Sequence, residues 1–531
     1  MISSENLFND TSDWRKAFTA VAEQMYALLN ACPRRALLAC STVNPRHPLP
    51  KDHLELVNMK MNPSALPLDY RPKISSQIIA FIKSIVFAIC ETSRIIFVHI
   101  RFYTDLRVFF REPANVVMKT WFFATPQDEG YDFYYGDLPN LLRINGLHCM
   151  LLGGNSGVTS TGTFVRGLLK SGRKAVPESA LVPLWGPASI IFDQVRTSIV
   201  LTKLGCKSKN RIFSAVAFRA SLECLKPATL QQALHFYIAK CAVEKWNPKF
   251  FATLYEGQPW EKLAWLGAKA ANSECITLGY QHTIVMPHSW GLLRPNFGSW
   301  EFPAPDKVLA LGNITIAMMK KGQQEFKTTF VPLGSFRRTT NGHAMRSPTP
   351  SQRVVLVVPE GIIEEATLLF EQAIQTAIMT PDHQFIFRCH PVLPFNQVRD
   401  RLSIDVSRIT NVEISTRVAI EEDFARSSVV LYRGSSVVLY GILSGLKPYY
   451  LNEPGRPFVD PLFHLKEWRE SIDTATQLSN ALHDYTQMDP ESARVAWAPA
   501  KTFVDQYSIT INESAISQAF DISSVEAKVK V

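Results

Sequence analysis

A histidine and a Gly-Ser-Ser stretch in the C-terminal half have the chemistry of an anion site. His390 and Pro391 follow the apolar segment FIF, and Gly434, Ser435 and Ser436 follow the apolar segment VVLY and one arginine. Imidazole and hydroxyl groups donate hydrogen bonds to phosphate oxygens, and a glycine lets the backbone come close to them. Singly, His-Pro is also typical of a turn and Ser-Ser of a helix N-cap. Their joint position after two strands predicts a phosphate site.

Other polar residues stand at the ends of neighbouring apolar segments. Glu360 and Gly361 follow VVLVVP, Arg388 precedes the His-Pro pair, and Glu413 lies in NVEIST. In an open parallel sheet, ligands bind outside the carboxyl ends of the strands. We therefore expect Glu360, Gly361 and Glu413 on the nucleotide side of the site.

The elements that must position these residues alternate regularly. Strand-like segments start near residues 353, 383, 411, 428 and 447, and helical segments separate them at about 362–379, 420–427 and 437–444. Strands that alternate with helices predict an open parallel sheet.

The N-terminal half repeats this pattern from about residue 115. Asp128 and Glu129 follow its first predicted strand, Glu256 follows a later one, and Gln281 and His282 end the next. A carboxylate or an imidazole at such a place can take a proton as a general base. Solvated loop residues, or hydrogen bonds within the core, are the alternatives.

Composition limits the class of protein. The 531 residues are 46% hydrophobic and 19% charged, which is typical of a folded globular protein with at least two domains. The net charge of +9 favours polyanionic partners, but the sequence has no motif typical of nucleic-acid binding, so we expect no nucleic-acid partner. Nine scattered cysteines without a C-x-x-C pair, and an N-terminus without an apolar signal segment, predict a cytoplasmic protein.

We divide the chain by changes in these patterns. The expected parts are a helical N-terminal attachment (1–112), a first Rossmann-like domain (113–337) with a mostly helical insertion (about 155–245), a polar linker (338–353), a second Rossmann-like domain (354–490), and C-terminal helices with a tail (491–531). Residues 77–103 are strongly apolar but carry Lys83, Glu91, Arg94 and Arg101. These charges oppose a simple membrane span and favour either a buried helix pair or a basic amphipathic element on an anionic membrane face.

The motifs carry a family resemblance. FRCHP and YRGSSVVLYGILSGLKPYYLN resemble the HP and S motifs of bacterial sialyltransferases and related Kdo transferases, which are GT-B enzymes that use CMP-activated acidic sugars. The acidic stretch QDEG resembles the motif that supplies their catalytic base, and YEGQPWEKL with LGYQHTIVMP resembles a group of bacterial surface-carbohydrate biosynthesis proteins. The segment between Glu413 and Ser435 is longer than in these sialyltransferases.

The resemblance implies the following assignments. His390, Ser435 and Ser436 would hold the CMP phosphate, with Arg388 at a position that is often basic in relatives. Glu413 would contact the ribose, and Asp128 or Glu129 would be the base. The tentative acceptor residues are Glu256, Gln281 and His282.

The implied protein is an α/β GT-B glycosyltransferase with two Rossmann-like domains that face a cleft. It would move a Kdo- or sialic-acid-like sugar from a CMP donor to a capsule, O-antigen or lipopolysaccharide acceptor, without a cofactor or a required metal. We expect it at the inner face of the cytoplasmic membrane. Three alternatives stay open: a CDP-alditol phosphotransferase of the teichoic-acid type, a non-catalytic nucleotide-sugar binding or assembly protein, and a UDP- or GDP-sugar transferase, whose usual carboxylate-rich donor motif is not evident.

Overall fold

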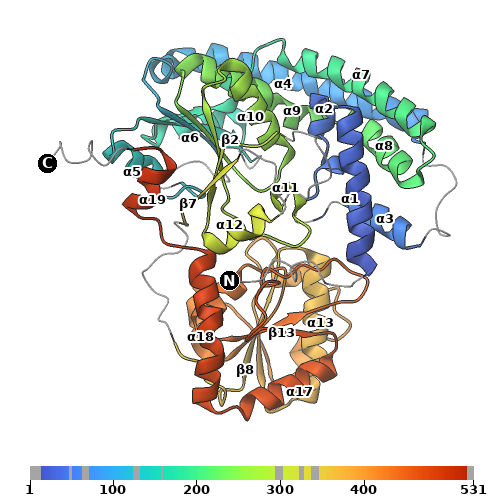
Figure 1. Cartoon of the computed structure of the whole chain (residues 1–531), viewed down its shortest axis with the longest axis vertical. Coiled ribbons are helices and arrows are strands. Elements are labelled where there is room, and N and C mark those ends of the chain that lie inside the picture. The colour runs from blue at the N-terminus through green and yellow to red at the C-terminus, as the bar shows by residue number, and fades with distance from the viewer. Residues whose placement is uncertain are drawn as a thin grey trace. The chain divides into compact units, whose positions relative to one another are not determined.

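The computed structural model of the chain contains two compact α/β units. It describes residues 13–46, 49, 51–62, 71–122, 132–156, 159–293, 303–321, 328–335 and 346–522. The N-terminal unit comprises the described residues of Thr11–Thr283, Ser289–Arg337 and Ile509–Val531, and the C-terminal unit those of Ile284–His288 and Arg338–Ser508. The expected α/β class with two Rossmann-like sheets is confirmed (Figure 1).

The N-terminal unit contains a parallel sheet in the order β3-β2-β1-β4-β5-β6-β7. Val116 of β1 is aligned with Cys149 of β2 on one side and with Phe250 of β4 on the other. The strand order therefore reverses between β1 and β4, which is the place where doubly wound sheets bind ligands. The strands are β1 (Val116–Phe122), β2 (Cys149–Asn155), β3 (Ala175–Pro177), β4 (Phe250–Leu254), β5 (Ile276–Tyr280), β6 (Lys307–Ala310) and β7 (Thr329–Pro332).

Helices of the chain's first hundred residues belong to the same core as this sheet. Phe18 and Met25 of α1 join one apolar cluster with Val116 and Phe250. The expected N-terminal attachment is thus part of the first unit. The helices of this unit are α1 (Asp13–Ala31), α2 (Arg35–Leu38), α3 (Lys51–Met61), α4 (Ile74–Phe109), α5 (Leu138–Ile144), α6 (Thr161–Lys170), α7 (Gly186–Lys207), α8 (Arg211–Glu223), α9 (Pro227–Trp246), α10 (Pro259–Ala271), α11 (Trp290–Leu293), α12 (Asn313–Lys320) and α19 (Glu513–Ala519).

The apolar segment at residues 77–103 forms one helix and not a helix pair. It lies within α4, a single helix of 36 residues with buried side chains along one side only. By length and hydropathy α4 is also the one helix, among those that the structure describes, that could cross a membrane.

The C-terminal unit has a parallel sheet in the order β10-β9-β8-β11-β12-β13. Its strand order reverses between β8 and β11, whose paired residues include Val357 with Leu431. The strands are β8 (Val354–Pro359), β9 (Gln384–Phe387), β10 (Val412–Ile414), β11 (Val429–Arg433), β12 (Lys447–Leu451) and β13 (Glu470–Ile472). The first five match the strands expected from sequence, and β13 adds an edge strand.

The helices of the C-terminal unit follow the expected alternation and continue beyond it. They are α13 (Ile363–Met379), α14 (Phe395–Arg399), α15 (Ile420–Arg426), α16 (Val437–Leu443), α17 (Ala475–Thr486) and α18 (Pro490–Tyr507). The Trp497 indole of α18 donates to the Ile442 carbonyl of α16 at 2.7 Å. The short helix α19 belongs to the N-terminal unit, where Phe520 packs edge-on against Phe250 of β4 with ring centroids 5.5 Å apart. The expected C-terminal helices are thus divided between the two units.

Candidate functional site

The carboxyl ends of β8 and β11 bring two of the predicted motifs together. Glu360 and Gly361 follow β8, and Gly434, Ser435 and Ser436 follow β11, which is its direct neighbour. This is the reversal point of the strand order, so the side chains and backbone of both loops border the same ligand position.

Gly434 lies against the Glu360 carboxyl group. Its φ of +71° is in the left-handed region, and a Cβ built there would stand 2.6 Å from the Glu360 Cδ. The positive φ favours glycine, and an added Cβ would force the Glu360 carboxyl group to move. The close approach places one carboxylate at the edge of the expected phosphate site, where it suits a ribose hydroxyl better than a phosphate.

His390 borders the same position from β9. A Cβ at Gly361 would lie 3.0 Å from the His390 Nδ1, so the imidazole stands over the loop that follows β8. The Val392 N–H donates to this Nδ1 at 3.3 Å, which leaves the proton of a neutral imidazole on Nε2. Partial burial lowers the pKa of His390, and the negative Glu360 opposes this shift.

Pro391 forms part of the turn after His390. The Leu393 N–H closes the turn by donating to the His390 carbonyl at 2.8 Å. The turn that His-Pro suggested is present, and the imidazole is nevertheless exposed at the strand end.

The two serines differ in exposure. Ser435 is buried with 5% of its surface exposed, whereas Ser436 is exposed at the N-cap position of α16 and makes no capping hydrogen bond with its side chain. The Ser436 hydroxyl is therefore not used as a cap, which was the alternative explanation of the Ser-Ser pair.

Arg433 fixes the loop that follows β11, and it was not among the candidate site residues expected from the sequence. Its guanidinium contacts Glu365 of α13 and donates to the Tyr450 hydroxyl at 3.1 Å and the Leu451 carbonyl at 3.0 Å. A fourth bond, to the Pro457 carbonyl, is 2.7 Å long. These bonds join the ends of β11 and β12 to α13, so Arg433 fixes the backbone that presents Gly434. The arginine in the quoted RGSS segment was the available signal.

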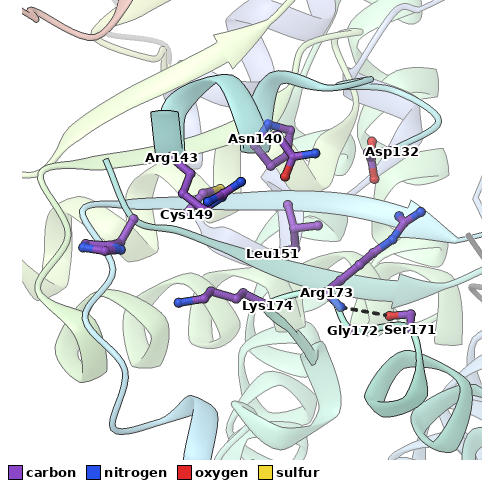
Figure 2. Close-up of a pocket in the computed structure, with 11 residues that line it drawn as sticks. Asp132, Asn140, Arg143, Cys149, Leu151, Ser171, Gly172, Arg173 and Lys174 are labelled. Atoms are coloured by element: carbon purple, nitrogen blue, oxygen red, sulfur yellow. Dashed lines mark hydrogen bonds between the residues drawn. The ribbon is translucent and has the colours of Figure 1, made fainter. Parts of the chain in front are cut away.

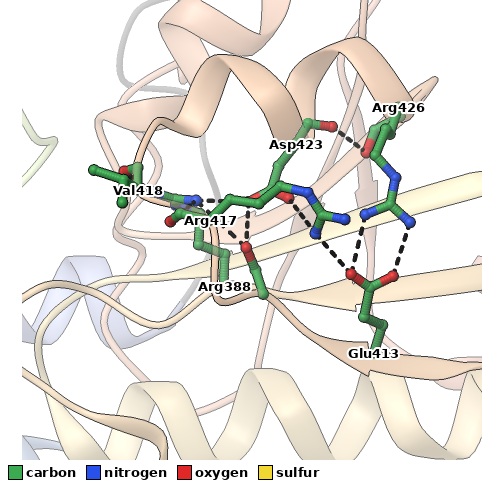
Figure 3. Close-up of polar contacts among 8 residues, drawn as sticks. Arg388, Glu413, Arg417, Val418, Asp423 and Arg426 are labelled. Atoms are coloured by element: carbon green, nitrogen blue, oxygen red, sulfur yellow. Dashed lines mark hydrogen bonds and ion pairs between the residues drawn. The ribbon is translucent and has the colours of Figure 1, made fainter.

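Arg388 and Glu413 are held in a network of ion pairs (Figure 3). The Arg388 Nη1 lies 2.6 Å from an Oδ atom of Asp423, a fully buried carboxylate on α15. Glu413 accepts from Arg426 at 2.8 Å and from Arg417 at 2.6 Å, and these bonds lower the pKa of Glu413 to about 2. The predicted ligand contacts of Arg388 and Glu413 would have to compete with these pairs. Glu360 is closer to the reversal point and does not face that competition from Arg417 and Arg426.

In the N-terminal unit, Glu256 and His282 form a pair at the ends of β4 and β5. Their Oε1 and Nε2 atoms are 2.8 Å apart, and the His282 side chain is buried. Burial alone would raise the pKa of Glu256, but the hydrogen bond and charge of His282 outweigh it, and the pKa falls below its usual value. A histidine oriented by a carboxylate is an arrangement that can act as a general base.

Gln281 has a structural role beside this pair. Its side-chain amide donates to the Thr283 carbonyl and accepts from the Leu311 N–H at 3.0 Å. The amide is thus bonded on both sides to the loops that follow β5 and β6.

The predicted bases Asp128 and Glu129 lie outside the described residues. Asp132, just after them, is buried and accepts from the Thr120 hydroxyl and from the backbone N–H groups of Tyr134 and Tyr135, each at 2.8 Å. These bonds anchor the chain at Asp132 beside β1. The assignment of a base to Asp128 or Glu129 stays a prediction.

A buried Lys-Glu-His cluster was not foreseen. The Lys119 Nζ of β1 lies 2.7 Å from an Oε atom of Glu178, and His235 of α9 lies 3.6 Å from the same oxygen. Burial lowers the pKa of Lys119 well below its usual value, with Asp132 opposing, and burial with the Lys119 charge lowers that of His235 to about 3. A lysine within the apolar strand VVMKTWF was the signal in the sequence.

This cluster borders a small cavity of about 80 Å³. Trp121, Asn155 and Pro177, which line it, lie at the carboxyl ends of β1, β2 and β3, and Glu91 and Arg94 reach it from α4. The cavity therefore lies on the ligand side of the first sheet.

A larger cavity, of about 430 Å³, lies beside α5 and is bordered by Arg143, Arg173 and Lys174 (Figure 2). His148 and Lys174 in its lining directly precede β2 and β3, at the amino ends of these strands. Ligands of parallel sheets bind at the opposite ends. The larger cavity therefore lies on the wrong side of the sheet for an active site, and the smaller cavity, at the carboxyl ends, is the better candidate.

Comparisons with known proteins give a structural likeness only. No family model matches the chain, and no curated protein matches it. The trehalose 6-phosphate synthase of Burkholderia multivorans is similar with a TM-score of 0.44 and 11% identity, over 78% of this chain and 98% of that one. The kitacinnamycin glycosyltransferase gives 0.43 and 14% over 78% and 99%, and Acinetobacter baumannii MurG gives 0.41 and 9% over 77% and 99%.

The similar structures also include a UDP-GlcNAc 2-epimerase from Methanocaldococcus jannaschii, at a TM-score of 0.39 and 11% identity over 74% of this chain and 98% of that one. A fold does not by itself define a reaction. The function has to be argued from the residues at the strand ends.

Proposed function

We propose that this protein is a GT-B glycosyltransferase that takes a CMP-activated acidic sugar, of the Kdo or sialic-acid type, as its donor. One observation carries the proposal: the loop with Gly434, Ser435 and Ser436 and the loop with Glu360 meet at the reversal point of a Rossmann-like sheet, with His390 over the second loop. The motif resemblance adds the CMP-sugar class. The acceptor would be a glycan of the cell surface.

The phosphate side of the proposal follows from the donors available. The neutral His390 offers its Nε2–H, and Ser435 and Ser436 offer hydroxyl groups. When the sugar leaves, the bond between its anomeric carbon and the phosphate oxygen breaks, and negative charge builds on CMP. Hydrogen bonds aimed at that charge stabilise the transition state more than the ground state.

Glu360 supplies the ribose side in this proposal. Its carboxylate lies under Gly434, at the edge of the donor position. A carboxylate in this place of a doubly wound sheet accepts hydrogen bonds from ribose hydroxyls. Glu413, which two arginines already hold, is the weaker of the two tentative ribose ligands.

The reaction also needs a base for the acceptor hydroxyl. The acceptor oxygen attacks the anomeric carbon, and its proton passes to the base as CMP departs. Asp128 or Glu129 is the predicted base, and the Glu256–His282 pair, whose Oε1 and Nε2 atoms lie 2.8 Å apart, is a second candidate. A single base with one displacement gives inversion at the anomeric carbon.

The first experiment measures CMP binding by titration calorimetry. His390→Ala and the double variant Ser435→Ala/Ser436→Ala should each weaken binding by about tenfold or more, because each lost hydrogen bond to a charged group contributes roughly 1.5–3 kcal/mol. His483→Ala is the matched control, since His483 is an exposed histidine on α17 of the same unit. Unchanged CMP affinity in both site variants would refute the phosphate site.

A second experiment tests donor and base. The protein is incubated with CMP-Kdo, CMP-sialic acid and CDP-glycerol, and release of CMP is followed. Release only from CDP-glycerol would replace the proposal by an alditol phosphotransferase, and CMP binding without turnover on any acceptor would favour a binding protein. Loss of turnover in Asp128→Asn/Glu129→Gln but not in His282→Ala would assign the base to the acidic loop, and the reverse would assign it to the Glu256–His282 pair.

A further inference from the structure

Helix α4 has an apolar face that no described part of the chain covers. Half of the exposed large apolar side chains among the described residues lie on this one helix. Ile82, Ile89 and Ile100 are 53%, 61% and 79% exposed. The other members of this face are Ile74, Ile78, Ile79, Val86, Ile96, Phe97, Tyr103 and Val108. A contiguous apolar surface of this kind on a folded protein marks an interaction site.

The opposite face of α4 fixes the helix to the protein. Its buried residues recur every three or four positions, as expected for one side of an α-helix. They are Ala80, Ser84, Ala88, Glu91, Ile95, Val98, Phe102 and Leu106. The Ser84 hydroxyl donates to the Gln194 side chain of α7 at 3.0 Å. The apolar face is therefore the outer side of a helix that is packed along its length.

The charges next to the apolar face are mainly positive. Lys83, Arg94 and Arg101 are separated by eleven and seven residues, which are close to whole numbers of helical turns, so they share one flank. Glu91 is buried and paired with Arg94 at 3.1 Å, and Asp105 is the one exposed acidic residue of α4. Apolar and basic side chains in this arrangement match the acyl and headgroup layers of an anionic bilayer.

We propose that α4 docks this face on an anionic phospholipid bilayer and lies in the interface without crossing it. A crossing helix would have to leave its contacts with the unit and carry Ser84, Glu91, Arg94 and Arg101 into hydrocarbon. In the interface orientation the buried face keeps its contacts, and the basic flank reaches the headgroups. In this proposal the length and hydropathy of α4, which would suffice for a membrane span, instead provide a long contact with the membrane surface.

Docking would also bring the first sheet's small cavity close to the lipid surface, on the side of α4 that faces away from the bilayer. Glu91 and Arg94 of α4 line the cavity at the carboxyl ends of β1, β2 and β3. A lipid-linked acceptor could then reach this cavity while its lipid stays in the bilayer. This consequence rests on the proposed function, whereas the docking itself does not.

The test is flotation of the full-length protein with vesicles of pure phosphatidylcholine and of equal parts phosphatidylcholine and phosphatidylglycerol. Ile82→Ser/Ile89→Ser/Ile100→Ser should reduce binding by about tenfold or more, because it removes apolar area that enters the bilayer. The control Ile378→Ser/Met379→Ser/Val495→Ser changes three comparably exposed apolar residues of the C-terminal unit and should bind as the wild type does. Circular dichroism checks that each variant is folded.

Charge is tested with Lys83→Gln/Arg101→Gln. Each basic residue near an anionic surface contributes roughly a fivefold preference, so this variant should lose most of the preference for phosphatidylglycerol, about 25-fold. Binding should be released by high salt and alkaline carbonate. CMP binding by the isoleucine variant should be unchanged, which separates failure of this proposal from failure of the nucleotide site.

Four outcomes would overturn the proposal. The first is absence of binding to both kinds of vesicle, and the second is equal binding by the α4 isoleucine variant and the wild type. The third is retention in the bilayer after carbonate, which indicates a span. The fourth is a dimer in light scattering that dissociates in the isoleucine variant, which indicates that a second copy of the chain covers this face.

Discussion

Replacing Gly434 by alanine tests the geometry at the centre of the candidate site. Gly434 has a φ of +71° and a Cβ there would lie 2.6 Å from the Glu360 Cδ. Gly455, in the same unit, has a φ of +80° but nothing within 4 Å of its Cβ position. The two glycines thus share the backbone strain, and only Gly434 adds a steric conflict.

The expected losses follow from these two terms. An alanine in the left-handed region costs about 1–2 kcal/mol, and this should be the whole effect of Gly455→Ala. The conflict with Glu360 should add about 1–3 kcal/mol for Gly434→Ala, as for other overpacked positions. In the Glu360→Ala background the penalty of Gly434→Ala should fall to that of Gly455→Ala, because the conflicting side chain is gone.

Hydrogen exchange of the amides in β8 is the assay. The slowest of these amides exchange through unfolding of the whole unit, so their rates report its free energy of unfolding. The additional cost of about 1–3 kcal/mol predicts exchange roughly 5- to 160-fold faster in Gly434→Ala than in Gly455→Ala. Equal rates in the two variants, or no relief by Glu360→Ala, would refute the placement of the carboxylate under Gly434.

Three further perturbations test other parts of the molecule. The arginine hydrogen bonds lower the pKa of Glu413 to about 2, so its contribution to stability is present above the unfolded pKa near 4.5 and is lost as the pH falls toward 2. The free energy of unfolding, measured at a series of acidic pH values, should show this loss, and Glu413→Gln should reduce its dependence on pH. Arg469→Met leaves the buried Asp460 carboxylate, now 2.5 Å from Arg469, without its cation and should cost about 3–5 kcal/mol in denaturant unfolding, whereas Arg399→Met breaks an exposed pair and should cost less than about 1 kcal/mol. Gly267→Ala should destabilise the N-terminal unit by about 3 kcal/mol or more, seen as a lower melting temperature, because its Cβ would stand 2.0 Å from a backbone oxygen of α9.

Each of these expectations has a contradicting result. An acid transition with the same slope in Glu413→Gln and the wild type would show that the arginine pairs do not set it. Similar losses for the Arg469 and Arg399 variants would show that Asp460 is not buried as described. A stable Gly267→Ala protein would mean that α9 and α10 can move apart at small cost.

Local pattern determined the elements and the order in which they follow one another. The alternation of β-rich apolar segments with helical periods predicted eleven of the thirteen strands that the structure describes closely enough to place each strand-end motif, for example His390 after β9 and Gly434 after β11. β3 and β13 have three residues each, which leaves almost no period to detect, and the equally short β10 was found because it continues the regular alternation of its neighbours. The apolar content of α4 was evident, but whether it made one helix or two was not.

Contacts between distant residues were decided by the tertiary structure. The sequence assigns Glu413 to a ribose, whereas the fold pairs it with Arg426. The sequence shows no partner for Lys119, and the fold brings Glu178, which follows β3, and His235 of α9 to it. Lys119 and His235 are 116 positions apart in the chain, and both approach the same oxygen of Glu178. The sequence by itself determined the strand ends and the polar groups that they carry, since these depend on neighbours in the chain; which of those groups are engaged in ion pairs, and which face of α4 is left to solvent, depends on how the sheets and helices pack.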